Sequence, residues 1–342
     1  MKKSLIAMAV LAASGAAMAQ SSVTLYGIAD VWVGSISTKT AGVTTRTTEM
    51  VSGGVSSSRW GMRGSEDLGG GLKANFQLEQ GFNMDDGAGT GFTRAANVGF
   101  SGGFGAVKFG VAGTAFDDAQ ARSASLFDSD LAPANGFTMA SGLKNAGAVF
   151  RSVQHAGKAT NQIHYQAPNM SGLSGAVSYA LAEDANGLPA GAKATTAFNL
   201  TYSGGPLGAE LAYQKEDLNN NANDVAYTRL GGAYDFGVAK AKLQYGKVSN
   251  VANVSGADTT EFAIGADIPV SANMTLGVGY AKSSDNVTAG DQKRSSYGLA
   301  VAYGLSKRTT VYGGLKMMTY DNPGLVADTD VSAVAFGVKH TF

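Results

Sequence analysis

The chain has 342 residues, 47 of them glycine, with 15% charged residues, no cysteine and a formal net charge of zero. Ordinary globular chains have about 7% glycine and about 25% charged residues. The missing basic excess excludes nucleic acid as a partner. The chain is 44% apolar, too apolar for disorder, yet no apolar run after residue 19 reaches the about 20 residues of a membrane-spanning helix. Many short strands are the remaining possibility.

Residues 1–19 have the features of a secretory signal peptide. Lys2 and Lys3 precede an apolar stretch that ends in Ala17-Met18-Ala19, a cleavage pattern of the A-x-A type. A short N-terminal membrane anchor is the alternative, but the apolar run is too short for one. We therefore predict a cleaved signal peptide at 1–19, a mature domain at 20–342, and export. The absence of cysteine is compatible with export without proving it.

From residue 22 onward the chain repeats an alternating run of about ten residues followed by a turn rich in Gly, Asn, Asp or Ser. The first predicted strand has a glycine kink at Gly27, and the Thr-rich stretch 35–54 is predicted to be a long loop. The last strand ends at Phe342. Between them, tight turns are predicted at 68–71, 101–105, 168–173, 204–206, 235–237, 269–273 and 305–308.

The predicted strands place apolar and polar residues on opposite faces. In 72–79, Leu72 and Phe76 share one phase, and Gln77 and Glu79 the other. A soluble sandwich also alternates, but about sixteen strands, joined alternately by tight turns and longer polar loops, are typical of an outer-membrane barrel. Backbone groups in lipid need partners, so such a sheet must close. We predict an all-β fold, a 16-stranded antiparallel transmembrane β-barrel with its termini and short turns on the periplasmic side.

A barrel of this strand number leaves a water-filled channel unless something plugs it. Its outer face would contact outer-membrane lipid. Aromatic residues near the predicted strand ends suit the interfacial girdles of such a protein; they are Tyr26, Tyr202, Tyr213, Tyr234, Phe236, Tyr280 and Phe342.

Residues 113–149 are the longest segment without convincing strand periodicity. A structureless connection of this length inside a compact domain is usually functional. We predict that this segment, called the insert below, folds into the lumen and narrows the pore. Its charged residues are Asp117, Asp118, Arg122, Asp128 and Asp130 in the first half.

Four arginines are candidates for the pore wall. Arg59 and Arg63 are in phase with glycine and serine, opposite the apolar face; Arg94 begins the strand before the insert, and Arg151 follows the insert. The apolar residues of strand 92–101 share the parity of Arg94, which predicts a bulge or register change there. We expect these arginines to face the carboxylates of the insert, which would create a transverse field. Solvated surface charge is the alternative.

No pattern of residues indicates catalysis. The chain has three histidines, His155, His164 and His340, but no G-x-S-x-G elbow, HExxH or glycine-rich phosphate loop. We predict no catalytic residue and no cofactor. The aspartates at 85–86, 117–118 and 128–130 could hold a structural calcium ion, but none has EF-hand spacing, so no metal site is predicted.

Residues 58–74, SRWGMRGSEDLGGGLKA, resemble a hairpin of the general trimeric porins of betaproteobacteria and neisseriae, and 23–27, 98–102 and Phe342 resemble the same family. The resemblance covers essentially the whole mature chain. It implies a 16-stranded homotrimeric barrel whose third loop forms the constriction, with arginines at the positions of Arg59, Arg94 and Arg151. It also implies that the barrel-assembly machinery recognises Phe342.

One departure from that family concerns selectivity. Where many members carry an arginine, this chain has Phe109-Gly110-Val111-Ala112-Gly113. We therefore predict an outer-membrane porin, a passive channel for small hydrophilic solutes and ions, with only mild anion preference. The alternatives are a substrate-specific channel, a non-conducting adhesin-type barrel and an outer-membrane hydrolase that uses His155 or His164.

Overall fold

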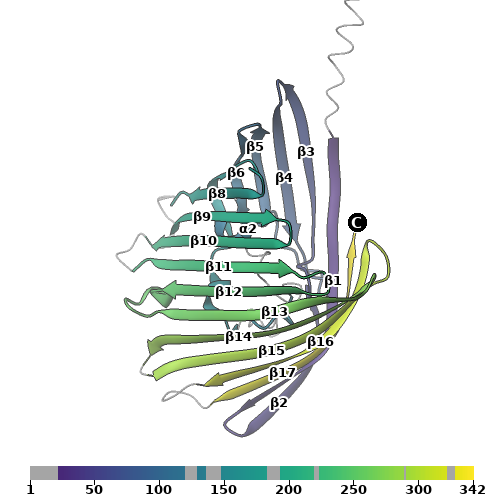
Figure 1. Ribbon diagram of the computed structural model, residues 1–342, viewed down its shortest axis with the longest axis vertical. Helices are drawn as coiled ribbons and strands as arrows, with labels where there is room; N and C mark the ends of the chain where they lie inside the picture. The colour runs from purple at the N-terminus through teal and green to yellow at the C-terminus, as the bar shows by residue number, and fades with distance from the viewer. Residues whose placement is uncertain are drawn as a thin grey trace, which may run out of the picture.

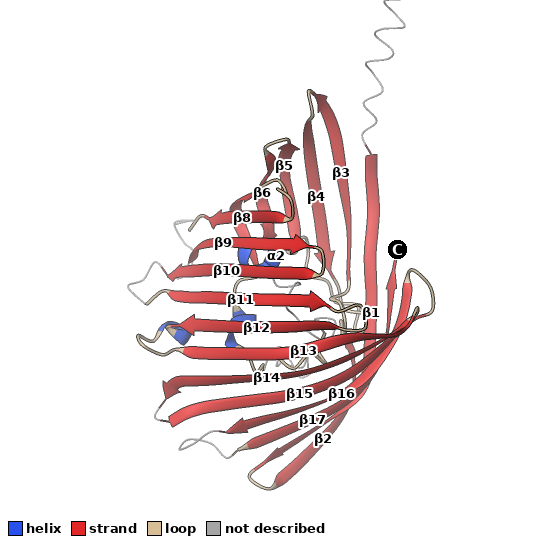
Figure 2. Cartoon of the chain, in the orientation of Figure 1, coloured by secondary structure: helices blue, strands red, loops and turns tan. Residues whose placement is uncertain are grey.

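The computed structural model describes residues 22–119, 129–135, 148–182, 193–218, 223–288, 290–321 and 328–342. Its strands form one antiparallel sheet that closes into a barrel (Figures 1 and 2). None of the helices in these ranges is long and apolar enough to cross a membrane. The elements are β1 (Ser22–Thr40), β2 (Val43–Ser52), β3 (Arg59–Gly69), β4 (Leu72–Gly81), β5 (Ala95–Gly102), β6 (Gly105–Gly113), α2 (Ala115–Ala119), the 3₁₀ helix η3 (Arg151–Gln154), β7 (Lys158–Gln166), β8 (Leu173–Ala180), β9 (Lys193–Gly204), β10 (Leu207–Leu218), β11 (Val225–Asp235), β12 (Lys240–Ser249), the 3₁₀ helix η4 (Val251–Asn253), β13 (Thr259–Ser271), β14 (Met274–Thr288), β15 (Gly290–Gly304), β16 (Thr309–Asp321) and β17 (Thr329–Thr341).

The barrel closes where the two ends of the chain meet. β1 pairs with β17, and beyond that ladder Gly27 and Phe342 exchange backbone hydrogen bonds of 3.0 and 3.1 Å. A Cβ at position 27 would lie 2.2 Å from Cζ of the Phe342 ring. Only glycine leaves room for this ring, so the predicted kink at Gly27 is the place where the C-terminal aromatic packs against the first strand.

The seventeen named strands make sixteen barrel strands, because β2 and β3 are two parts of one strand. β2 pairs with β1 from Val31 to Thr40, and β3 pairs with β1 from Ser22 to Ile28. The predicted 16-stranded antiparallel barrel is therefore confirmed.

Asp30 holds the bend at 53–58 that separates β2 from β3. Its carboxylate accepts hydrogen bonds from the backbone N–H groups of Gly54, Val55 and Ser56 at 2.8–3.1 Å, and from the hydroxyl of Tyr312 at 2.5 Å. The Asp30 side chain is fully buried. Because a buried carboxylate needs several donors, this group fixes the bend and links it to β16.

The two faces of the wall differ as the alternation predicts. In β17, Val334 and Phe336 are exposed, whereas Ala333 and Ala335 are buried. In β13, the exposed Ile264 has the opposite phase to the buried Glu261. Aliphatic and aromatic side chains therefore cover the outer face, which faces lipid in a membrane barrel, and small or polar side chains line the lumen.

The predicted long loop at 35–54 is wrong. Residues 35–40 continue β1, and Val43–Ser52 form β2, so the segment is a β-hairpin. Its turn is Ala41-Gly42, with φ values of 51° and 81°. Threonine and valine favour strands, and two residues with positive φ suit the twist of a tight hairpin.

Candidate functional site

The predicted segment 113–149 belongs to a longer connection between β6 and β7, residues 114–157, and from here on the insert means this whole connection. Its described parts are 114–119, which includes α2, 129–135, and the return segment 148–157. Figure 2 shows α2 beside β9 and β10, which it contacts. The insert contacts inward-facing side chains on β9, β11, β13, β14 and β16, which are distributed around much of the barrel. A short segment can reach all of them only from the lumen.

The first anchor of the insert holds α2 against β9 to β11. The side-chain amide of Asn199 donates to the carbonyl oxygen of Ala115 at 2.5 Å, and Arg229 Nη2 donates to that of Phe116 at 2.7 Å. The Arg229 guanidinium lies 4.2 Å from the Phe116 ring centroid and pairs with Glu210 at 3.0 Å. The side chains of Arg229 and Glu210 are 2% and 0% exposed. Such a pair is stable only when its hydrogen bonds are complete, so it serves to hold the insert.

The second anchor holds the return segment against β13 and β14. The Ser283 hydroxyl donates to the Val149 carbonyl at 2.5 Å. The Glu261 carboxylate accepts from both the backbone N–H and the hydroxyl of Ser152, at 2.8 and 2.5 Å. Glu261 is fully buried in this contact, which therefore satisfies a carboxylate that would otherwise be very costly to bury.

Arg151 is not a wall residue, and the prediction that placed it there is wrong. It lies in η3, within the return segment of the insert. Its Nε donates to Asp285 at 3.0 Å, and the same carboxylate oxygen accepts from Arg294 at 2.8 Å. The chain turns through a 3₁₀ helix before β7 begins at Lys158, so strand phase does not apply to Arg151.

The third anchor is Lys316 on β16. Its ammonium group donates to the carbonyl oxygens of Asp130 at 3.2 Å, Ala132 at 2.7 Å and Asn135. Lys316 is fully buried. The backbone N–H of Asp130 in turn donates to Gly54 at 2.8 Å, which ties 129–135 to the bend that Asp30 holds.

The aspartates of α2 fasten the two ends of the insert to each other and to β7. Asp117 pairs with Lys158 and lies 3.5 Å from His155; Asp118 lies 3.2 Å from His164. Burial raises the pKa of Asp117, but the hydrogen bond with His155 and the charge of Lys158 outweigh it and lower that pKa to about 2. Asp117 is therefore ionised in the intact contact.

Of the remaining predicted insert residues, Asp130 lies at the third anchor, whereas Arg122 and Asp128 lie outside the described residues. Within the described ranges, no group of three or more His, Cys, Asp or Glu side chains could hold a metal ion.

A second set of charges lies on the inner side of β3 to β6. Arg94 Nε donates to Glu79 Oε1 at 2.8 Å, and Arg59 Nε lies 3.7 Å from Glu79 Oε2. The two arginine side chains are 25% and 27% exposed. The carboxylate that these two arginines share comes from β4 and not from the insert. The predicted bulge or register change in this strand is wrong: β5 begins only at Ala95, after Arg94, and it pairs with β4 and β6 without a register shift.

Tyr26 lies level with Glu79 in the strand register and connects this set to Arg63, which is nearer the turn at 68–71. Its hydroxyl donates to Glu79 at 3.0 Å and accepts from Gln77 at 2.7 Å, and the Arg63 guanidinium lies 5.2 Å from its ring centroid. The predicted girdle position for Tyr26 is therefore wrong. The register explains the difference, since Tyr26 lies opposite Gly61, which shares its phase with Arg59 and Arg63.

Sequence reasoning missed Glu79, Tyr26 and Lys158 as charged or polar partners in the lumen. For Glu79 a signal was present, because it shares the polar phase of β4 with Gln77, and the tight turn at 68–71 sets it near Arg59. The partners on β13 to β16 had no such signal, since they meet residues more than a hundred positions away.

A closed barrel with an apolar outer face, a charged lumen and an inward-folded connection defines a membrane channel protein. The family model for Gram-negative porins matches residues 5–323. The outer membrane porin protein 32 of Delftia acidovorans is 36% identical, and a Bordetella pertussis outer membrane porin is 30% identical; each alignment covers 100% of both chains. An anion-selective porin from Comamonas acidovorans superimposes with a TM-score of 0.77 at 29% identity, over 94% of this chain and 100% of that one.

The chain therefore belongs to the Gram-negative porin family, and the predicted family membership is confirmed. It is an integral outer-membrane protein and a passive diffusion channel.

Proposed function

We propose that this porin prefers small hydrophilic anions, mildly rather than strongly. The observation that carries the proposal is the composition of the inner side of β3 to β6, which we call the open face. Five cations lie there against two carboxylates. The cations are Arg59, Arg63, Lys73, Arg94 and Lys108; the carboxylates are Glu79, which pairs with Arg59 and Arg94, and Asp67, which lies opposite Lys73 beside the turn. A basic wall lowers the energy of an anion in the pore and raises that of a cation. The anion-selective relative from Comamonas acidovorans supports the same sign.

The reversal potential in a planar bilayer under a KCl gradient tests this proposal. Anion preference predicts a reversal potential displaced toward that of chloride. A reversal potential displaced toward that of potassium would refute it. Adding salt should weaken the preference, because exposed charges are screened beyond about 8 Å at physiological ionic strength.

We propose that the insert sets the cross-section of the pore. The three anchors place 115–119, 129–135 and 148–154 against the inner side of β7 to β16, which we call the anchored face. This arrangement leaves the path for solutes next to the open face. A non-conducting barrel would instead show negligible single-channel current.

The histidines support a channel without catalysis. His155 Nδ1 lies 2.7 Å from the Ser152 carbonyl, and its Nε2 faces Asp117. His164 lies beside Asp118. Both rings thus hold the ends of the insert, and we propose that neither one activates a nucleophile. Loss of a measured hydrolytic activity on replacing either histidine would contradict this assignment.

Three further parts of the proposal concern assembly. Residues 1–19 are removed from residues 20–342 after export, the mature barrel is a homotrimer in outer-membrane lipid, and the assembly machinery recognises Phe342. The exposed ring of Phe342, 48% accessible at the barrel seam, supports the last point. N-terminal sequencing of the mature protein, native mass spectrometry in detergent and the assembly yield of Phe342→Ala test the three points in turn.

A further inference from the structure

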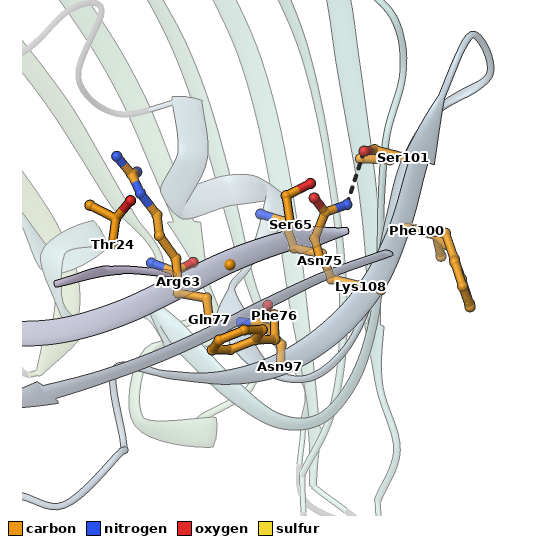
Figure 3. A pocket seen from close by; sticks show the side chains of 14 residues that line it. Thr24, Arg63, Ser65, Asn75, Phe76, Gln77, Asn97, Phe100, Ser101 and Lys108 are labelled. Carbon is orange, nitrogen blue, oxygen red and sulfur yellow. Dashed lines mark hydrogen bonds between the residues drawn. The ribbon is translucent and has the colours of Figure 1, made fainter. Parts of the chain in front are cut away.

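The open face contains a cavity of about 370 Å³ nearer the turn end of the barrel than the Arg59–Glu79–Arg94 cluster. Figure 3 shows Arg63 and Lys108 among the side chains that line it, with amide and hydroxyl groups between them. The sequence predicted Arg63 only as a residue of the pore wall and gave Lys108 no role, and Lys108 is not among the described side chains that hold the insert.

The strand register explains why these side chains share one cavity. Arg63 on β3 lies opposite Gln77 on β4, which lies opposite Asn97 on β5. One step nearer the turns, Asn75 lies opposite Gly99, which lies opposite Lys108 on β6. Arg63 and Lys108 therefore stand at opposite ends of a trough that is four strands wide, or about 14 Å at the usual strand spacing. Their long side chains can close on a solute that lies between them.

The floor of the trough is polar and open. Gly99, which lies opposite Lys108, adds no side chain to the floor, and a Cβ there would collide with the backbone of β6. Asn75 donates to the Ser101 hydroxyl at 2.9 Å. Because that hydroxyl already accepts a hydrogen bond, its own proton is directed elsewhere and can be donated to a solute.

The charge of the cavity has one sign. No carboxylate is among its lining residues, and in the described part of the chain neither Arg63 nor Lys108 has an ion-pair partner. In this respect it differs from the Arg59–Glu79–Arg94 cluster, where one carboxylate is shared by two arginines. Two cations that share a cavity without a counter-charge are best satisfied by an anion that carries two charges.

We propose that this cavity binds a small, doubly charged tetrahedral oxyanion, of the sulfate or phosphate class. Arg63 and Lys108 hold the charge, and Ser101 donates a hydrogen bond. The inference rests on the proposed anion preference and adds to it a saturable site below the constriction. Such a channel passes chloride freely while the site is empty. An oxyanion that resides in the site longer than chloride does would partly block the chloride current.

Titrating potassium sulfate against the chloride current of single channels tests the proposal. We expect sulfate to reduce the chloride current with a saturating dependence on concentration. Arg63→Gln and Lys108→Gln should each raise the half-blocking concentration about fivefold, because each removes one close charge. Arg46→Gln is the control, since Arg46 is an exposed cation of the β1–β2 hairpin and does not line the cavity.

A chloride current that changes with sulfate only as the ionic strength changes would refute the binding site. An equal change of the half-blocking concentration in all three variants would refute it as well. The reversal potential under a KCl gradient, measured on the same channels, distinguishes this failure from that of the proposed function. Anion preference without sulfate block refutes only the site, whereas cation preference refutes the proposed selectivity. If one variant fails to assemble, the other still tests the site against Arg46→Gln.

Discussion

The anchored face and the open face of the lumen use the same residue types for different purposes. On the anchored face, Arg229 and Lys316 are buried and their donors bind backbone carbonyls of the insert. On the open face, Arg59 and Arg94 remain about a quarter exposed. An inward-facing charge is therefore structural where the insert covers it, and it can act on solutes where the insert does not.

The difference has a simple energetic basis. A charge removed from water must be paired and fully hydrogen-bonded, and its loss leaves the partner unpaired. A charge beside water needs no such partner, and its replacement changes the local potential more than the stability. Substitutions on the two faces should consequently separate stability from selectivity.

The largest effect is expected from shortening the insert, because the insert covers the anchored face and leaves the open face accessible. Deleting residues 119–144 within the predicted constriction loop should raise single-channel conductance by about twofold or more, because a 16-stranded barrel is wide when nothing occupies its lumen. Single-channel recording in KCl measures this. Shortening the β1–β2 hairpin at 38–45, which lies at the tip of that hairpin, is the control and should leave conductance unchanged. Equal conductance in both deletion variants would mean that the insert does not limit the pore.

The next largest effect is a difference in protein stability between a substitution on the anchored face and one on the open face. Arg229→Met removes one partner of a buried pair and should lower the free energy of unfolding by about 3–5 kcal/mol. Arg63→Met on the open face should change it by less than about 1 kcal/mol. Urea unfolding of the refolded barrel in detergent compares them. Similar losses for both variants would contradict the distinction between the two faces.

Ion selectivity should instead depend on the charges of the open face. Replacing Arg59 and Arg94 together by glutamine leaves Glu79 without its cations and should move the reversal potential toward that of potassium. Arg46→Gln, in the exposed part of the β1–β2 hairpin, should not move it. A double variant that keeps the wild-type reversal potential would show that this cluster does not control permeation.

The smallest effect concerns pH. The pKa of Asp117 is lowered to about 2 from an ordinary value of 3.8. A lowered folded-state pKa stabilises the fold above the unfolded value, and that contribution is lost as pH falls from about 4 toward 2. We expect current fluctuations from a loosened insert to increase over this range. Asp117→Asn should show the fluctuations already at neutral pH and lose the dependence between pH 4 and 2; a wild-type pH dependence in that variant would contradict the assignment.

Much of the wall could be predicted because membrane strands obey local rules. Alternation in 72–79 places Glu79 and Leu72 on opposite faces without reference to any other strand. The hairpin at 35–54 was missed because its many threonines suggest a polar loop, although β-branched residues also favour strands. Tyr26 was assigned to the outer face because residue type was given more weight than its phase with Thr24.

The candidate site was predicted only in part. Arg59 and Arg63 lie on β3, as phase indicated, and Arg94 lies directly before β5, whereas Arg151 lies in η3 on the insert. Asp117 and Asp118 lie in the lumen but contact Lys158 and His164 rather than the wall arginines. Phase predicts which face a strand residue occupies, but it says nothing about how an irregular segment folds inside the barrel.

The number of strands, their alternation and the presence of one long insert could all be predicted from the amino-acid sequence. These follow from backbone hydrogen bonding in lipid, which forces every strand to carry the same local pattern. Which inward-facing charges the insert covers depends on how the chain packs across the lumen. The contacts of Ser152 with Glu261 and of Lys316 with Ala132 join residues 109 and 184 positions apart, and packing across the lumen leaves no periodic signal in the chain.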